Sequence, residues 1–225
     1  MQDDGTIGGL VRAWIDGWVV SRGAADPVTR PWGWTVDVGQ RAQVSRHVLP
    51  TPEEAEVRRI AAATRAPGTW LKLFAPDETV RPWLGAGWRF DQPGYLMTVP
   101  LASEQPAVPS GYQLTDWTRG GVTRVLVRTA AGEFAARGQV APTGRSAVFD
   151  QIETHPAHRR RGLGALVMRT LQHTAHTAGA ETGILVGTPD GRALYTTLGW
   201  TTRSAMASLW YDPDASPEAP SRAKP

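Results

Sequence analysis

The segment HPAHRRRGLGALVMRTL, residues 155–171, places three consecutive arginines directly before a Gly-x-Gly. Apolar residues then recur at helical spacing, so the glycines fall in the first turn of a predicted helix. Backbone N–H groups at a helix start have no intrahelical partner, and the helix dipole adds partial positive charge there. Arginines are unfavourable at such an end unless an anion lies beside them, and glycines leave room for one. The segment predicts a diphosphate site; the alternative is a solvated basic cluster.

Two common phosphate-binding patterns fit this segment poorly. A Walker A loop needs Gly-x4-Gly-Lys-Ser/Thr, and a dinucleotide fingerprint needs a third glycine where Val167 stands. RRRGLG instead satisfies Arg/Gln-x-x-Gly-x-Gly/Ala, the pyrophosphate loop of the GNAT superfamily of acyl-CoA N-acyltransferases. Farther along, PDGRALYTTLGW resembles a later helix of the same superfamily. The chain therefore resembles a GNAT enzyme over residues 112–211.

This resemblance implies acetyl-CoA as co-substrate and a primary amine as acceptor. Tyr195 matches the tyrosine that protonates the departing CoA thiolate, with a packing role as the alternative. Asp190 stands where the superfamily usually has asparagine, which weakens a role for that side chain. The resemblance assigns the pantetheine arm and the thioester oxygen to a diverging strand end, Ile152, Glu153 and Thr154, and the diphosphate to Arg159, Arg160, Arg161, Gly162, Leu163, Gly164 and Ala165.

Amine attack on a thioester needs a neutral amine, so a base or a water relay is expected. Asp150 and Glu153 are the nearby acids. They stand three apart on a predicted strand and should point to opposite faces, so only one can address the acceptor. We favour Asp150, with water alone as the alternative. The chain has no cysteine, so a ternary-complex mechanism is expected rather than a thioester intermediate on the protein.

Composition narrows the classes of function. The formal net charge is only +3, and Lys72 and Lys224 are the only lysines, which disfavours nucleic-acid binding. The histidines of the basic segment have no zinc-type spacing, so no metal is expected. No stretch of roughly 18 apolar residues is present, so we expect a cytoplasmic protein without a membrane partner. A non-catalytic acyl-CoA-binding or regulatory module is the alternative function; neither the acceptor nor the oligomeric state can be read from the sequence.

The chain divides into two predicted halves. Residues 102–111 have the composition of a linker between residues 1–101 and the GNAT-like residues 112–211, and residues 212–225 resemble a disordered tail. The segments LFAPDETVRPWLGAGW and LVGTPDGRALYTTLGW, one in each half, form a weak internal repeat. We therefore expect an α/β fold with a mixed, mostly antiparallel twisted sheet flanked by helices, in tandem GNAT-like halves.

The first half should not bind CoA. Its helix in TPEEAEVRRIAAAT carries acids in the first turn, capped by Thr51, and these would repel a diphosphate. An amphipathic helix should open the chain from Ile7 to Val19, and another helix is expected over residues 118–131. The first half should complete the sheet or wall the acceptor pocket, with Trp32, Trp34, Trp70 and Trp83 as candidate liners.

Overall fold

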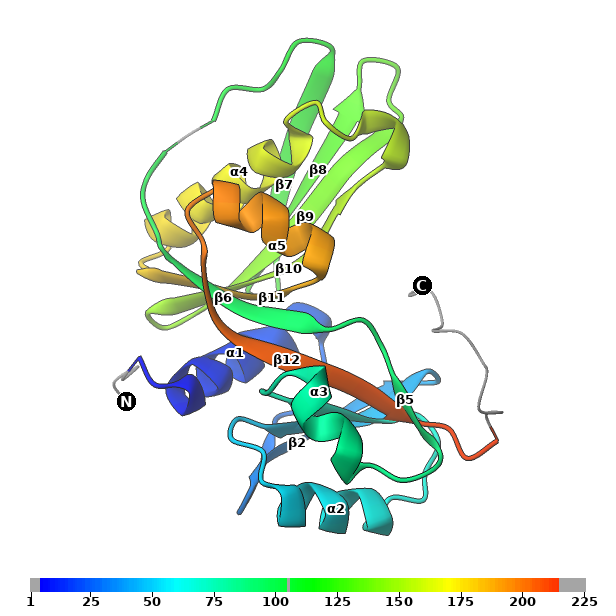
Figure 1. The fold of residues 1–225 in the computed structure, drawn as a ribbon. Coiled ribbons are helices and arrows are strands. Elements are labelled where there is room, and N and C mark those ends of the chain that lie inside the picture. The colour runs from blue at the N-terminus through cyan, green and yellow to red at the C-terminus, as the bar shows by residue number, and fades with distance from the viewer. Residues whose placement is uncertain (1–4, 105, 215–225) are drawn as a thin grey trace.

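The computed structural model describes residues 5–104 and 106–214, which form both helices and strands (Figure 1). In chain order they are α1 (Ile7–Arg22), β1 (Val28–Arg30), β2 (Gly33–Gln40), β3 (Gln43–Leu49), α2 (Glu54–Ala63), β4 (Thr69–Leu73), α3 (Asp77–Val80), η1 (Arg81–Trp83), β5 (Trp88–Phe90), β6 (Gly94–Pro100), β7 (Tyr112–Arg119), β8 (Val122–Thr129), β9 (Phe134–Thr143), β10 (Ser146–Thr154), η2 (Pro156–His158), α4 (Leu163–Thr177), β11 (Thr182–Gly187), α5 (Pro189–Thr197) and β12 (Thr201–Tyr211).

The strands of the described residues form one sheet in the order β1-β2-β3-β4-β12-β6-β11-β10-β9-β8-β7, with β5 beside β12. Two of its pairings, β3 with β4 and β10 with β11, are parallel. The others are antiparallel. The predicted fold class, a mixed and mostly antiparallel sheet flanked by helices, is confirmed.

The two halves of the chain share strands. β6 belongs to the first half, yet it lies between β11 and β12 of the second. The long strand β12 pairs with β6 through its first part and with β4 and β5 through its last residues. Figure 1 shows β12 running from the upper to the lower part of the molecule. The proposed boundary at residues 102–111 contains no helix or strand among its described residues, and the division into two domains stays a prediction.

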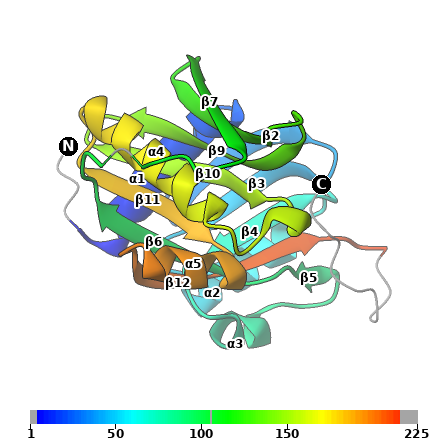
Figure 2. The ribbon, with the colours of Figure 1, turned by 90° about the horizontal axis from the view of Figure 1, so that it is seen from above.

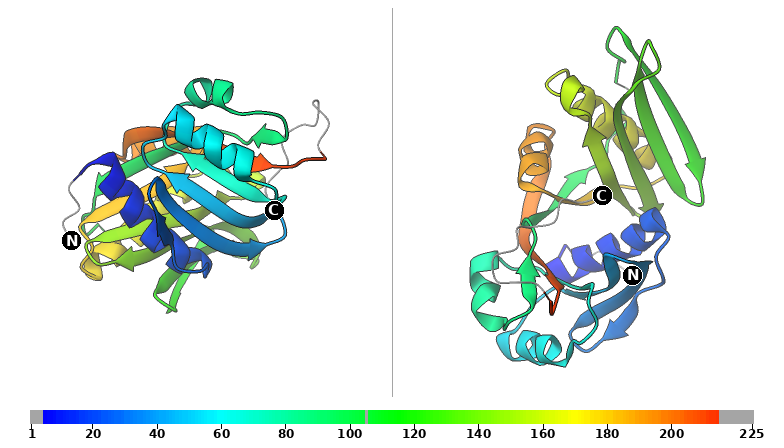
Figure 3. Two further views of the ribbon diagram at one scale, coloured as in Figure 1. Left: turned by 90° about the horizontal axis from the view of Figure 1, so that it is seen from below. Right: turned by 90° about the vertical axis from the view of Figure 1, so that its right-hand side faces the viewer.

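Helix α1 packs between the two parts of this bent sheet (Figure 3, right). Thr6 accepts a hydrogen bond from the Gly9 N–H at its start, and left-handed Gly23 ends it. Its buried residues join Val36 and Val48 of the first half to Val148 and Ile184 of the second in one apolar cluster. The predicted opening helix is confirmed, and the structure shows that it connects the two halves.

The remaining helices cover the outer faces. α4 lies over β8, β9 and β10, on the face opposite α1 (Figure 2). In the first half, α2 and α3 pack over the face formed by Leu49, Leu71 and Leu73, away from α1 (Figure 3, left). Each half therefore has a helix layer on its outer face, and α1 fills the space between the halves.

The helix predicted over residues 118–131 is wrong. Strands β7 and β8 form a hairpin here, and its turn is made by Gly120 and Gly121, both at positive φ (59° and 75°). A two-residue turn with both residues at positive φ fits the twist of an antiparallel pair. Along β8 the buried residues Thr123, Val125 and Val127 then alternate with less buried ones, as in a strand. The glycine pair outweighs the helical spacing of the apolar residues.

The predicted cap of the second helix is also wrong. α2 begins at Glu54 and its N-cap is Glu53, whose side chain makes no capping hydrogen bond. Pro52 favours an extended conformation for Thr51 before it, so the helix starts after the proline rather than around it. The acids nonetheless lie in the first turn of α2, as expected.

Candidate functional site

Strands β10 and β11 separate at the middle of the second half. Their parallel pairing covers only Ser146 to Val148 of β10, opposite Thr182 to Ile184 of β11. Beyond this point β11 continues beside β6, and β10 continues beside β9. The divergence expected from the resemblance is therefore present. Residues 152–154 of β10 and Leu185 to Gly187 of β11 consequently make no backbone pairing with one another.

A β-bulge lies at the start of this divergence. The register of β10 with β9 shifts between Asp150 and Glu153, and Gln151 has a positive φ of 54°. One extra residue in a strand reverses the alternation of the side chains that follow it. The prediction that Asp150 and Glu153 point to opposite faces is therefore wrong.

Both carboxylates lie on the face of the sheet that α1 covers. Asp150 contacts Ser21 of α1. Glu153 pairs with Arg137 (2.8 Å), which stands two residues before Gln139, another neighbour of Ser21. Gly138, between Arg137 and Gln139 in β9, faces the other way: a Cβ on it would lie 2.6 Å from Val167 of α4. Only Asp150 is enclosed; the Glu153 side chain is half exposed.

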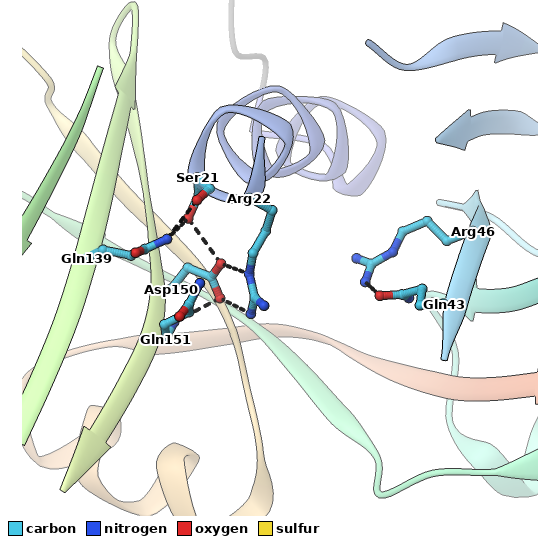
Figure 4. Close-up of polar contacts among 7 residues, drawn as sticks. All are labelled: Ser21, Arg22, Gln43, Arg46, Gln139, Asp150 and Gln151. Atoms are coloured by element: carbon cyan, nitrogen blue, oxygen red, sulfur yellow. Dashed lines mark hydrogen bonds and ion pairs between the residues drawn. The ribbon is translucent and has the colours of Figure 1, made fainter. Parts of the chain in front are cut away.

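Asp150 is held by the C-terminal end of α1 (Figure 4). Ser21 Oγ donates a hydrogen bond to Asp150 Oδ2 at 3.0 Å. Arg22 donates to both carboxylate oxygens, from Nη2 to Oδ1 at 2.9 Å and from Nε to Oδ2. The Gln151 N–H also donates to Oδ1 (2.8 Å). Gln139 Nε2 donates to the Ser21 carbonyl and hydroxyl (2.8 and 2.7 Å). The carboxylate is thus fixed in place at the point where β10 and β11 separate.

Arg46 of β3 extends toward this network from the other half (Figure 4). It is only 7% exposed and lies over the Trp18 ring, with its guanidinium carbon 3.7 Å from the ring centroid. Burial and, less strongly, Arg22 lower the pKa of Arg46 to about 9, and Asp150 acts in the opposite direction. Sequence reasoning missed Ser21, Arg22 and Arg46 because they are far from Asp150 along the chain.

The basic loop between β10 and α4 is exposed. Arg159, Arg160 and Arg161 all reach the surface, and the loop turns into α4 at Gly162, whose φ is 79°. Glycine has no side chain to cap the first-turn N–H groups, so they point toward the loop without a side-chain partner. Cations and free donors therefore meet here, as the sequence predicts.

The loop is fixed from one side by β7. The Tyr112 hydroxyl lies 3.1 Å from His158 Nδ1 and accepts a hydrogen bond from Arg161 Nη1 (3.2 Å). Arg159 Nε donates to the Thr154 carbonyl at 3.4 Å. These contacts leave most guanidinium donors of the loop directed to solvent, and Tyr112 is a neighbour that the sequence did not indicate.

The two glycines of this loop differ. A Cβ at Gly162 would meet nothing within 4 Å, whereas a Cβ at Gly164 would lie 2.8 Å from Leu194 Cδ2 of α5. Gly164 therefore allows close packing of α4 against α5, a reason separate from room for a ligand. Leu163 is buried in the core of this half, and Ala165 is half-buried.

Tyr195 lies in α5 and is 7% exposed. Its ring packs on Trp200 and on the backbone of Gly187 and Gly191, where a Cβ would be 2.9 Å away in each case. Burial, and secondarily the Asp150 carboxylate, raise the pKa of Tyr195 to about 12. The phenol therefore stays protonated at neutral pH and can donate a proton. Asp190 lies exposed in the first turn of α5.

The tryptophans proposed as pocket liners do not form one wall. Trp34 packs with α1, Trp70 stacks on Trp210, and Trp32 packs edge-on against His47. Trp83 lines a cavity of about 320 Å³ near Phe74, and a second of about 390 Å³. Neither cavity includes Tyr195 or the basic loop.

Two further features are absent from the described residues, a metal-binding cluster and a membrane-spanning helix. No cluster of three or more His, Cys, Asp or Glu suited to a metal ion occurs among them. None of their helices is long and apolar enough to cross a membrane.

Comparisons with known proteins show similarity in fold and, over part of the chain, in sequence. Residues 143–211 match the family model described as FR47-like protein. A GCN5-related N-acetyltransferase from Kribbella flavida superposes with a TM-score of 0.67 at 18% identity, over 93% of this chain and 96% of its own. A GNAT-family acetyltransferase from Novosphingobium aromaticivorans gives 0.55 at 17%, over 90% and 96%.

A tandem GNAT protein from the clavulanic acid biosynthesis pathway is also similar. Its TM-score is 0.50 at 16% identity, over 72% of this chain and 69% of its own. No curated protein sequence matches the chain. The solved structures establish the fold, and the family match falls on β10, α4, β11, α5 and β12, the elements that carry the candidate site.

Proposed function

We propose that this chain, whose fold and FR47-like residues 143–211 resemble those of GNAT-superfamily proteins, transfers an acetyl group from acetyl-CoA to a primary amine. The observation that carries this proposal is the juxtaposition of three features. They are the exposed arginines at the uncapped start of α4, the divergence of β10 from β11, and the protonated Tyr195. A cytoplasmic location belongs to the same proposal.

The donor would lie along the outer side of the divergence. Its diphosphate would contact Arg159 to Arg161 and the N–H groups of Gly162 to Ala165, as cation and dipole favour. The pantetheine arm would follow the backbone of Ile152, Glu153 and Thr154, which no longer pairs with β11. That backbone also supplies N–H donors to the thioester oxygen as negative charge develops on it.

The transfer proceeds by direct attack. The neutral amine nitrogen forms a bond to the thioester carbonyl carbon, and the carbon–sulfur bond then breaks and leaves its electron pair on the CoA sulfur. We assign to Tyr195 the proton that this thiolate takes up, because its phenol is protonated at neutral pH and its ring lies against Gly187, at the end of β11 that has left β10. A solvent proton restores the phenol, and the attacking nitrogen loses its proton to the acceptor side of the site.

On the acceptor side we assign Asp150 as the group that orients the amine and receives its proton, directly or through water. Its carboxylate is fixed by Ser21 and Arg22 at the divergence. Glu153 would contribute through its backbone, because its side chain is half exposed and paired with Arg137.

The ion pair of Asp150 with Arg22 also supports a second candidate, a non-catalytic acyl-CoA-binding module. In that case acetyl-CoA would bind without turnover in the presence of any amine. Release of free CoA thiol with a panel of primary amines distinguishes the two functions.

The donor site is tested by calorimetric titration of acetyl-CoA into the wild type and Gly162→Glu. A carboxylate at this position would repel the diphosphate, so binding should be lost. Any side chain at Gly162 is strained by its φ of 79°, so Gly179→Glu is the matched control: Gly179 has a φ of 89°, open surroundings, and lies at the far end of α4. Equal affinity of both variants, or no binding to folded wild type, would refute the donor site.

A further inference from the structure

Two cations and one carboxylate meet where the halves of the chain face one another. Arg22 and Asp150 both influence the charge of Arg46, in opposite directions, and the guanidinium carbons of Arg22 and Arg46 lie 6.0 and 3.7 Å from the centroid of the Trp18 ring. Asp150 is paired with Arg22. The cluster of Arg22, Arg46 and Asp150 therefore has two positive charges and one negative charge, a net charge of +1.

The excess charge is on Arg46. Its Nη2 donates to Gln43 Oε1 at 3.0 Å, but its buried Nε has no hydrogen-bond partner among the described residues. A glutamine oxygen is neutral and supplies no counter-charge, and the Asp150 carboxylate is already paired with Arg22. Burying a guanidinium without a counter-ion is costly, and the stacking on Trp18 offsets only part of that cost. A planar guanidinium with unused donors matches a carboxylate.

The uncompensated charge of Arg46 lies near the proposed site of acyl transfer. Arg46 extends from β3 toward the Arg22–Asp150 pair (Figure 4). Asp150 lies where β10 leaves β11 and is close enough to Tyr195 to raise the pKa of its phenol. The cluster is reachable from solvent on the Arg22 side, since that side chain is 34% exposed. A molecule entering there meets a carboxylate near the transfer point and an unsatisfied cation across from it.

We propose that this cluster is the acceptor subsite and that the acceptor is an amine that also carries a carboxylate, as an amino acid does. The acceptor carboxylate binds Arg46, and its amino group lies beside Asp150. This inference rests on the proposed acyl transfer and names its substrate class. It also gives the first half of the chain a role, because β3 supplies the specificity residue while the second half supplies the chemistry.

The test compares matched amines that differ by one carboxylate: L-lysine with cadaverine, L-ornithine with putrescine, and L-phenylalanine with phenethylamine. Binding to the full-length protein is measured by calorimetry with and without CoA, and turnover by thiol release from acetyl-CoA. A charge-assisted contact to a buried guanidinium is worth about tenfold or more in affinity. At least one carboxylate-bearing amine should therefore bind, and react, about tenfold better than its partner.

Substitutions of Arg46 test whether this residue causes the preference for a carboxylate-bearing amine. Arg46→Gln should abolish the discrimination within a pair, and Arg46→Lys should restore part of it. Arg12→Gln is the control, since Arg12 pairs with Asp16 on the same helix α1 and lies outside the cluster. Thermal melts report whether each variant is folded, and the wild-type comparison needs no variant at all.

The outcomes separate this inference from the proposed function. Amines acetylated without preference for a carboxylate would overturn the subsite and leave the acetyltransferase intact. Failure to bind acetyl-CoA would refute the proposed function, while calorimetry with the amines alone would still decide the subsite. The inference would be overturned if none of the carboxylate-bearing amines bound more tightly than its partner, which includes the case in which no amine binds. It would also be overturned if the folded Arg46→Gln variant still discriminated between the two amines of a pair.

Discussion

The two halves of the molecule each contain a parallel strand pair joined by a helix, and they differ at the position where a ligand would bind. In the first half α2 connects β3 to β4; in the second α4 connects β10 to β11. β3 and β4 stay paired from Ser45 to Leu49 with no break, whereas the pairing of β10 with β11 ends at Val148. Only the second unit opens its sheet beside the helix start.

The helix starts differ in charge as well. α2 has Glu53 at its N-cap and Glu54 and Glu56 in its first turn, so its own carboxylates complement the dipole. α4 has Gly162 at its N-cap, no acid in its first turn, and arginines before it. One architecture thus occurs once as a closed structural unit and once as an open, cationic one. We therefore expect the donor at α4 and none at α2.

The largest expected effect comes from removing the cations of the open unit. Replacing Arg159, Arg160 and Arg161 by glutamine should weaken acetyl-CoA binding by about 10² or more, because each charge-assisted phosphate contact is worth about tenfold. Calorimetry measures the loss. The control replaces Arg58 and Arg59 of α2 by glutamine and should leave affinity unchanged. Equal losses in both variants would remove the distinction between the units.

A second contrast concerns two Trp–Tyr pairs. Trp200 packs on Tyr195 of α5, whereas Trp88 of β5 packs on Tyr211 of β12. Tyr195→Phe should lower kcat about 10²-fold, as loss of a general acid does, with acetyl-CoA affinity nearly unchanged. Tyr211→Phe removes a phenol hydroxyl from the other pair, away from the divergence of β10 and β11, and should leave kcat unchanged. Full activity of Tyr195→Phe would assign that ring to packing alone.

Much of the open unit could be predicted from the sequence because its residues are contiguous. RRRGLG, the following helix and Tyr195 need no long-range information. The bulge at Gln151 was not predictable, since a non-glycine residue at positive φ has no local signature there. Arg22 and Arg46 escaped prediction because tertiary folding brings them near Asp150 from α1 and β3. The β7–β8 hairpin was signalled by its glycine pair, which helical spacing obscured.

The third prediction tests how α1 supports the open unit. A Cβ at Gly17 would lie 2.4 Å from Val148 Cγ2 and 3.3 Å from the Ala141 carbonyl. Gly17→Ala should therefore destabilise the protein by about 1–3 kcal/mol, as overpacking does. Gly8→Ala on the same helix meets only Thr6 Oγ1 at 3.9 Å and should stabilise by up to about 1 kcal/mol. Urea unfolding measures both; stabilisation by Gly17→Ala would contradict the close packing.

The smallest effect is a pH dependence. The folded-state pKa of Tyr195 is raised to about 12, so an unfolded phenol ionises first, near pH 10. The folded protein then binds more protons than the unfolded chain, and stability is lost as pH rises from 10 toward 12. At pH 11 the wild type should have lost about 1.4 kcal/mol more than Tyr195→Phe, relative to pH 9. Urea unfolding at both pH values checks it; identical losses would contradict the burial of the phenol.

The central claim, that the open unit alone holds acetyl-CoA, is tested most directly by amide hydrogen exchange with and without this ligand. The account predicts slower exchange at residues 152–154 and 162–165, and unchanged exchange at the start of α2, residues 54–58. Protection at α2, or none at the start of α4 under saturating ligand, would contradict it.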